Sequence, residues 1–274
     1  TAGGVYGELD STGRFGIFTT AVIVPILHSR PLKRLEVYDS ESDLVLFDFK
    51  SMTASNSPLV SSPDFQETFP CLSADNRTIY FARARHLTQP DSTAMMHYDL
   101  YSIGFDPSTG KLGDSLNLVF DASSKGLSVS FPKCSRDGRK LLFCVSQYGT
   151  FPIWHPETDI WMLDLATGSV DRLENVNSDL SDTYHCWSSN SRWFVFASKR
   201  GDGMFGRPYI SFVPEDGTPT KPFLLPQKDP DRYITTFKSF NIPELYDAPE
   251  KYDASSIRKT YYRGETRKMK YVKR

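Results

Sequence analysis

A hairpin motif recurs four times along this chain and limits what the chain can fold into. Each copy begins with an aromatic residue, reaches a Ser or Asp, turns within two or three residues, and continues through Arg into an apolar run. The turn centres, such as Asp137-Gly138, are residues that tolerate the positive φ of tight hairpins. The copies occupy residues 6–18, 69–81, 131–143 and 184–196.

The spacing of the copies predicts the architecture. Ser73, Ser135 and Ser188 are 62 and 53 residues apart, and Asp10 lies 63 residues before Ser73. A third strand-like run, such as Asp159–Asp164, follows each hairpin, so the repeat is a four-stranded unit with long loops. One such unit cannot bury both of its faces, and stacked neighbours must supply the core. The sequence therefore predicts an all-β chain, a β-propeller of four-stranded blades.

The repeats divide the chain into blades and a tail. The expected units are blades at 1–59, 60–120, 121–174 and 175–226, a closing segment at 227–245, and a basic, Tyr-rich tail at 246–274. Four blades is the lower end of what closes a ring, so we expect further blades before Thr1. In three blades the longest insertion, such as Thr19–Glu36, separates the second and third strands. These loops are expected to crowd one end of the propeller.

Composition and charge exclude several classes of protein. Aromatic residues reach 14% and charged residues 24%, which is typical of a packed globular chain. Residues 256–274 hold eight Lys or Arg and one Glu, whereas the whole chain has a net charge of −1. An acidic body with a basic tail argues against a nucleic-acid-binding surface. The longest apolar run, Ile17–Leu27, is too short to span a membrane and contains Pro25.

Motifs of cofactor, metal or catalytic chemistry are missing or out of context. Gly201–Gly206 reads GxGxxG, but a dinucleotide site needs that loop to open a helix, and here Pro208 and an expected strand follow. No GxSxG or HExxH occurs, and the five His residues have no metal-ligand spacing. We therefore expect no catalytic residue, no cofactor and no metal. The four cysteines lack CxxC spacing and are expected to be small buried hydrophobes.

The loops and one inner strand supply the candidate binding residues. The loop residues combine aromatic rings with Arg, the composition of binding hot spots. They are Trp154, His155, Arg200, Phe205, Arg207 and Tyr209. His185 has two interpretations: a satisfied core group beside Trp187, which packs between blades, or a residue that lines a central funnel with Tyr184.

The repeats resemble those of TolB-like, WD-type propellers, whose core reads W-S-P-D-G-x-x-I-x-F. More specifically, the chain is similar to a group of TolB-like proteins from Bacteroidetes bacteria. The segments that carry this resemblance are 67–70, 128–132, 153–155, 184–193, 207–209, 221–227 and 239–244. The resemblance implies a location in the periplasm or at the outer membrane, and a protein-interaction role. The C-x-x-C-H sequence of some members is absent here, so haem attachment is not expected.

Three functional hypotheses follow. The first is a non-enzymatic platform of the cell envelope that binds a protein partner through its long strand 2–3 loops. The second is a propeller that binds or processes carbohydrate or peptide in the funnel, using His185 and the acidic positions Glu67 and Asp182 on equivalent inner strands. In the third, the basic tail docks the protein into a larger outer-membrane assembly.

Overall fold

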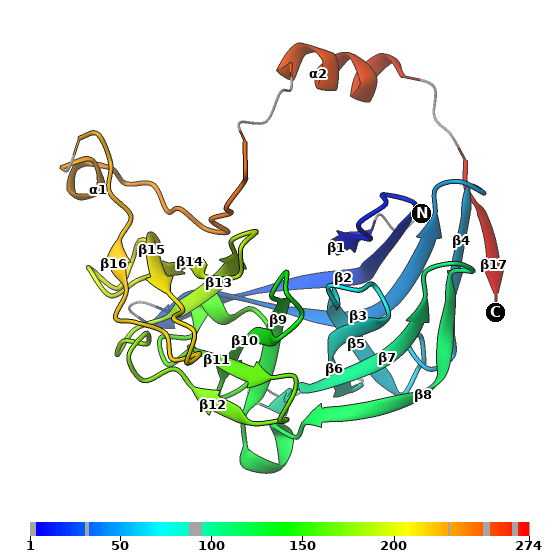
Figure 1. The fold of residues 1–274 in the computed structure, drawn as a ribbon, viewed down its shortest axis with the longest axis horizontal. Helices are drawn as coiled ribbons and strands as arrows, with labels where there is room; N and C mark the ends of the chain where they lie inside the picture. The colour runs from blue at the N-terminus through cyan, green and yellow to red at the C-terminus, as the bar shows by residue number, and fades with distance from the viewer. Residues whose placement is uncertain are drawn as a thin grey trace.

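The computed structural model describes residues 4–30, 33–87, 95–229, 231–248, 253–264 and 268–273. Within them the chain is almost entirely β (Figure 1). Helices are few and short: the 3-10 turns η2 (Ser123–Lys125) and η3 (Pro152–Trp154), then α1 (Arg232–Thr235) and α2 (Ala254–Arg263). No helix in the described ranges is long and apolar enough to cross a membrane.

The described strands form four sheets, and in each sheet four strands that are consecutive in the chain pair antiparallel to make one blade. Blade 1 contains β1 (Val5–Leu9), β2 (Phe15–Arg30), β3 (Lys33–Asp48) and β4 (Thr53–Asn56). Blade 2 contains β5 (Phe65–Leu72), β6 (Thr78–Arg85), β7 (Asp99–Asp106) and β8 (Lys111–Phe120). Blade 3 contains β9 (Ser128–Cys134), β10 (Lys140–Ser146), β11 (Asp159–Asp164) and β12 (Val170–Arg172). Blade 4 contains β13 (Asp182–Trp187), β14 (Trp193–Ser198), β15 (Arg207–Phe212) and β16 (Phe223–Leu224).

The sheets fan around one axis, with the first strand of each blade innermost (Figure 1). The predicted fold, a propeller of four-stranded blades, is confirmed.

The recurring Ser-x-Asp sequence closes the first hairpin of a blade through side-chain hydrogen bonds. The Ser135 hydroxyl donates to Asp137 Oδ1 over 2.7 Å and accepts from the Lys140 amide over 2.9 Å. Asp137 Oδ1 also accepts from the Arg139 amide over 3.1 Å. Ser73 with Asp75, and Ser188 with Asn190, make the same contacts. The next residue has positive φ in all four hairpins: Gly13 69°, Asn76 56°, Gly138 70° and Ser191 56°. The turn chemistry expected from sequence is therefore present.

Apolar side chains between adjacent blades form the core. Phe15 and Ile17 of blade 1 pack with Phe81 and Ile103 of blade 2. Phe143 of blade 3 lies in the cluster shared with blade 2. Phe194, Phe196 and Trp187 of blade 4 pack on Leu142, Ile160 and Met162 of blade 3. Trp187 therefore packs between blades, as expected, and its indole nitrogen donates to the Lys133 carbonyl over 3.1 Å.

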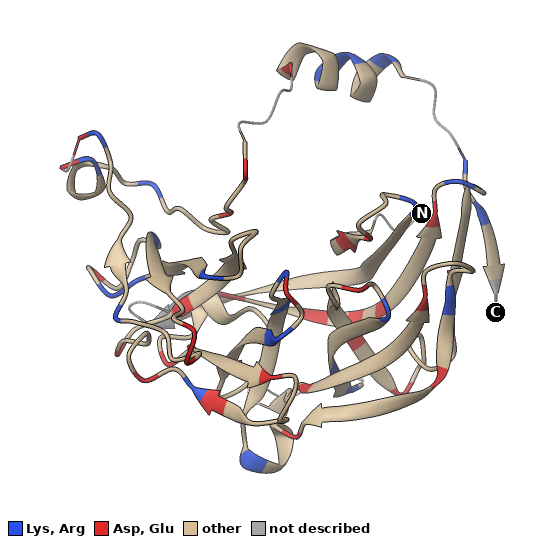
Figure 2. Ribbon diagram, viewed as in Figure 1, with Lys and Arg blue, Asp and Glu red and all other residues tan. Residues whose placement is uncertain are grey.

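The sequence left two arrangements open for residues 227–245, which could pack along the outside of the propeller or close its ring. In the part of this segment that the structure describes, the chain contains α1 and then lies along blade 4, with the Phe240 amide donating to the Gly206 carbonyl over 2.8 Å. The basic tail contains α2 and, among its described residues, ends in β17 (Lys270–Lys273). β17 pairs in parallel with β4, so the tail reaches from blade 4 to the outer edge of blade 1 (Figure 1). Figure 2 shows Lys and Arg along α2 and β17.

The Thr19–Glu36 insertion is part of the sheet rather than a separate loop. β2 and β3 stay paired from Phe15 with Asp48 to Arg30 with Lys33, far beyond the strand lengths of the other blades. Both strands also contact β5, and β3 contacts η3. The long hairpin thus crosses the strand 2–3 end of the propeller beside its axis (Figure 1). Cross-strand pairing extended both strands because nothing in the insertion forced them apart.

Candidate functional site at the funnel mouth

Four aromatic rings close the propeller axis. They belong to the residues that open the four repeats, and each lies where the pairing of an inner strand with its neighbour is shifted by a bulge. Each has the positive φ that bulky residues rarely adopt: Tyr6 48°, Phe69 52°, Phe131 51° and Tyr184 52°. The ring centroids lie 4.7 Å (Tyr6–Phe69), 3.9 Å (Phe69–Phe131) and 4.6 Å (Phe131–Tyr184) apart. We call these residues the aromatic layer.

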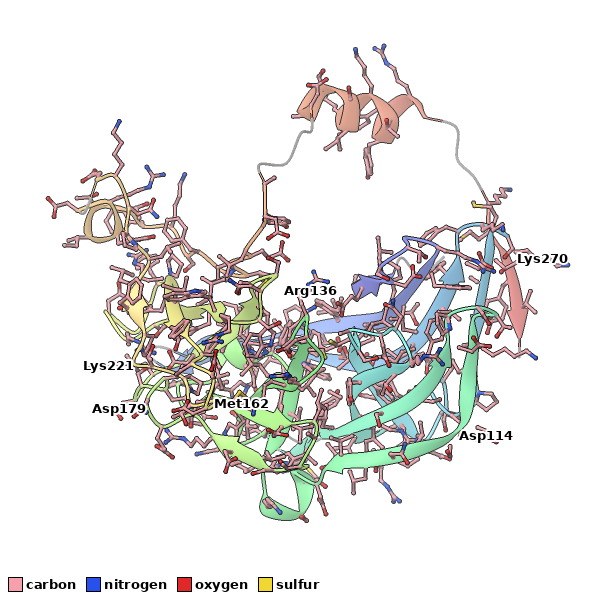
Figure 3. The ribbon with its side chains drawn as sticks, viewed as in Figure 1. Asp114, Arg136, Met162, Asp179, Lys221 and Lys270 are labelled. Carbon is pink, nitrogen blue, oxygen red and sulfur yellow. The ribbon has the colours of Figure 1, made fainter. Side chains whose placement is uncertain are left out.

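Above the aromatic layer, toward the strand 1–2 turns, a cavity of about 550 Å³ opens. Phe131 and Tyr184 form part of its floor. Its walls are the ends of inner strands and their turns, at residues 7–11, 72–76, 133–136 and 185–187. Figure 3 labels Arg136, which lies on this rim. We call this cavity the funnel mouth.

Charges of both signs line the funnel mouth. Lys133 Nζ lies 3.8 Å from Glu8 Oε2, and the Leu72 amide donates to the same oxygen over 3.2 Å. Burial acts to lower the pKa of Lys133. The Glu8 carboxylate and other negative neighbours, including Glu244, act in the opposite direction and have the larger effect, so the pKa of Lys133 is raised. Lys133 is therefore a fixed cation at the site, able to hold a carboxylate.

The chain itself lies across the funnel mouth. Residues 236–247, here called the strap, run along blade 4, and Ile242–Tyr246 line the cavity. At one end Arg207 donates to the carbonyls of Lys238 (2.6 Å) and Thr236 (3.1 Å). At the other end the Ser189 hydroxyl donates to the Asp247 carboxylate. An extended segment thus already occupies part of the site.

A buried polar layer lies on the other side of the aromatic layer. It contains the Thr68, Ser130 and Thr183 hydroxyls, each one residue before an aromatic ring and each without a hydrogen-bond partner among the described residues. Asp39 of β3 is fully buried nearby, and its carboxyl oxygens also lack partners of hydrogen-bonding geometry there. Burial raises the pKa of Asp39 to about 7, and the neighbouring Thr68 hydroxyl opposes the shift.

The raised pKa of Asp39 predicts a pH-dependent stability. Unfolded Asp39 loses its proton near the usual pKa of about 4, whereas folded Asp39 keeps it to about pH 7. The folded state therefore binds more protons in this window, and stability falls as pH rises through it. We expect Asp39→Asn to flatten the dependence between pH 5 and pH 7 by about 2 kcal/mol, measured by urea unfolding. An unchanged slope in Asp39→Asn would contradict this assignment.

The structure places the predicted loop residues mainly in structural contacts. Arg207 is 7% exposed and anchors the strap, and His155 is 1% exposed between Glu36 (Nε2 to Oε1, 3.5 Å) and Glu157 (Nδ1 to Oε1, 3.3 Å). Arg200 bonds the buried Asp182 and stacks on Tyr209, with its guanidinium carbon 4.5 Å from the ring centroid. These three contacts were missed because a sequence pattern does not show which loop side chains fold back onto the protein.

The other loop residues remain half-exposed. The Lys199 ammonium lies over Trp154, with its nitrogen 5.3 Å from the ring centroid. Phe205 packs against Phe237 of the strap, and their ring centroids lie 6.1 Å apart. Together with Tyr209 they are spread over blade 4 and the loop of blade 3, and the cavity that Trp154 lines includes neither Phe205 nor Tyr209. The strand 2–3 end is therefore a weaker candidate than the funnel mouth.

His185 is 3% exposed and lines the funnel mouth with Tyr184, but it is not the fully satisfied core group of its first interpretation, because its buried Nε2 has no hydrogen-bond partner among the described residues. Burial lowers the pKa of His185 to about 3, and its Nδ1 lies 3.7 Å from Cys144 Sγ. A ring that stays neutral at physiological pH is poorly suited to shuttle protons. Glu67 and Asp182 pair with Arg83 (2.9 Å) and Arg200 (2.8 Å) of their own blades. The geometry therefore does not favour the funnel-processing hypothesis.

Sequence reasoning missed the most informative site residues. Lys133, Glu8 and Arg136 were not singled out, although Lys133 directly follows the Phe-Pro pair of its repeat. The aromatic layer had a visible signal, because an aromatic residue opens every copy of the motif. The cysteines were only partly anticipated: Cys71 and Cys144 are buried, but Cys134 and Cys186 are half-exposed at the funnel mouth.

Comparison with solved structures bears on the fold. A nutrient binding protein described as auxiliary, from Bacteroides thetaiotaomicron, aligns over 84% of this chain and 43% of its own, with 8% identity and a TM-score of 0.50. TolB from Acinetobacter baumannii aligns over 81% and 45%, with 16% identity and a TM-score of 0.45. The fold is a β-propeller, like that of the Bacteroides protein. Prolyl oligopeptidase B from Galerina marginata aligns over 83% and 29%, with 12% identity and a TM-score of 0.48.

This chain spans less than half the length of each of these three solved chains. Neither a protein-family model nor a curated protein sequence matches it. At identities this low, the likeness concerns the fold alone. The function has to be argued from the candidate site.

Proposed function

We propose that this protein is a cell-envelope binding module that holds an extended segment of a partner protein at the funnel mouth. The observation that carries the proposal is the cavity of about 550 Å³ on the axis, lined by residues of both charges and by an extended segment of the chain. The closed aromatic floor limits entry to one side, as suits a segment laid across the opening. The likeness in fold to a Bacteroides nutrient binding protein and the TolB-like repeats support an envelope location.

In this proposal the binding face is the funnel mouth and not the strand 2–3 loops. Peptide recognition needs charged groups that a partner can reach, and both Lys133, which Glu8 holds in place, and the exposed Arg136 line the cavity. His155 and Arg207 are instead buried within the protein, where a partner cannot reach them. The platform hypothesis is kept, and its binding face is moved to the other end of the propeller.

Two matched variants test the binding face. The intact protein is used to capture partners from detergent-solubilised envelopes of its native cell, with quantitative mass spectrometry. Lys133→Glu/Arg136→Glu should lower recovery of a stoichiometric partner by about tenfold or more, as expected for hot-spot residues. Trp154→Ala, at the other end, should leave recovery unchanged. Loss only in the second variant would move the site to the loops, and loss in neither would refute the proposal.

A further inference from the structure

The strap is held firmly at its ends and loosely between them. Residues 236–240 make the hydrogen bonds to Arg207 and Gly206, and Gly206 also donates to the Ser239 hydroxyl over 3.2 Å. Across the funnel mouth Ile242 is 60% exposed and Tyr246 63% exposed, and only Pro243 and Leu245 are half-buried. Such a stretch buries little apolar area and is inexpensive to lift.

The strap also carries a strained residue at the point where it reaches the cavity. Ile242 has a φ of 57°, an outlier for a β-branched side chain. A conformation of this kind is strained and persists only when its surroundings impose it. Release of the strap would relieve this backbone strain. That relief would offset part of the free energy lost with the few contacts of the strap.

The contacts of the strap with the cavity have the pattern of peptide recognition. Glu244 and Leu245 line the same cavity as Lys133 and Cys186, and the Glu244 carboxylate adds to the negative charge that raises the pKa of Lys133. Pro243 and Leu245, on alternate positions, are half-buried, whereas Ile242, Glu244 and Tyr246 are exposed. Alternate inward side chains on an extended backbone, with an acidic group near a fixed cation, are features by which extended peptides are recognised.

We propose that Ile242–Tyr246 is a displaceable internal ligand of the funnel mouth, and that the partner segment is of the same chemical class: extended, proline-containing and acidic. The inference rests on the proposed function and adds to it the class of ligand and a built-in competitor. Because the competitor is part of the same chain, its effective concentration is in the millimolar range, and an external segment binds only after it leaves. The strap thereby sets a threshold of affinity for partners.

The probe for this inference is a fluorescent synthetic peptide with the sequence of residues 239–247, titrated onto the full chain. In the unlatched variant Leu245→Gly/Asp247→Ala, which loses the half-buried side chain and the bond to Ser189, the peptide should bind about tenfold or more tightly than in the wild type. Alkylation of Cys186 should be faster in the unlatched variant and should slow again when peptide is added. Ser189→Ala, a milder change on the blade side, should shift affinity a few-fold in the same direction.

Charge specificity gives the second arm. A peptide with Lys at the Glu244 position should bind the unlatched variant about tenfold more weakly, and Lys133→Glu should reverse that order. No peptide binding to the unlatched and Ser189→Ala variants, both with wild-type thermal melts, would overturn the inference.

Partner capture separates this inference from the proposed function. Greater partner recovery by the unlatched variant supports both, whereas recovery equal to the wild type, and still lost in Lys133→Glu/Arg136→Glu, leaves the funnel as the binding face and makes the strap merely structural. That result would overturn the inference alone.

Discussion

Arg200→Leu should destabilise the propeller by about 3–5 kcal/mol, because it leaves a buried carboxylate without its cation. Asp182 is fully buried and accepts from Arg200 Nη2 over 2.8 Å. The same guanidinium donates to the Val176 carbonyl over 2.7 Å, which ties the end of blade 3 to blade 4. Removal of the side chain would leave Asp182 Oδ1 and the Val176 carbonyl without this donor in a site with little access to water, while Asp182 Oδ2 would keep its hydrogen bonds from Ser178. Urea unfolding monitored by circular dichroism measures the loss.

A matched control separates burial from charge. Arg192 also pairs with an acid in blade 4, but its partner Glu215 is 93% exposed, and the two groups lie 3.7 Å apart. Arg192→Leu should therefore cost about 1 kcal/mol or less. Equal losses in Arg192→Leu and Arg200→Leu would show that burial of Asp182 is not what makes its ion pair important. A large loss of stability in Arg200→Leu would also explain any loss of partner binding in that variant, so that Arg200 would not need to contact the partner directly.

Phe143→Ala should cost about 3–5 kcal/mol, because it opens a cavity between two blades. The Phe143 side chain is fully buried in the cluster that joins blades 2 and 3, and its ring centroid lies 5.7 Å from that of Phe120. Blades stack only through such faces, so the loss falls on the whole assembly rather than on one sheet. Thermal and urea unfolding should both shift, with one transition retained.

The control for Phe143 is a phenylalanine outside the core. Phe223 in β16 is 49% exposed, so Phe223→Ala should change the free energy of unfolding by about 0.5 kcal/mol or less. A loss in Phe143→Ala as small as that in Phe223→Ala would mean that the blade interface relaxes to fill the space. Two separate transitions in Phe143→Ala would instead show that blades 1–2 and 3–4 unfold independently.

The site and its stability are coupled through the aromatic layer. The rings that floor the funnel mouth belong to bulges whose positive φ is repeated in all four blades. The same rings separate the charged mouth, with Lys133 and Glu8, from the buried polar layer that contains Asp39. If a partner segment binds at the mouth as proposed, the packed rings beneath it need no reordering, so the site itself loses little conformational entropy on binding.

The sequence alone determined the local structure and, through its repetition, the architecture. Ser135, Asp137 and Gly138 predict a hairpin because their side-chain and backbone preferences act within five residues. Four copies of that signal, each too small to bury its own faces, predict stacked blades without any knowledge of long-range contacts. The packing of Trp187 between blades followed from the same reasoning.

Only the tertiary structure decided which polar side chains are available to a partner. Arg200 and Arg207 have the composition of a binding loop, yet each is held by groups from distant positions, such as Val176 and Lys238. Lys133 reads as an ordinary strand residue, and it becomes a site residue because Glu8 and Glu244 arrive from blade 1 and the strap. Exposure and charge pairing depend on contacts between segments far apart in the chain, and a local pattern carries no record of those contacts.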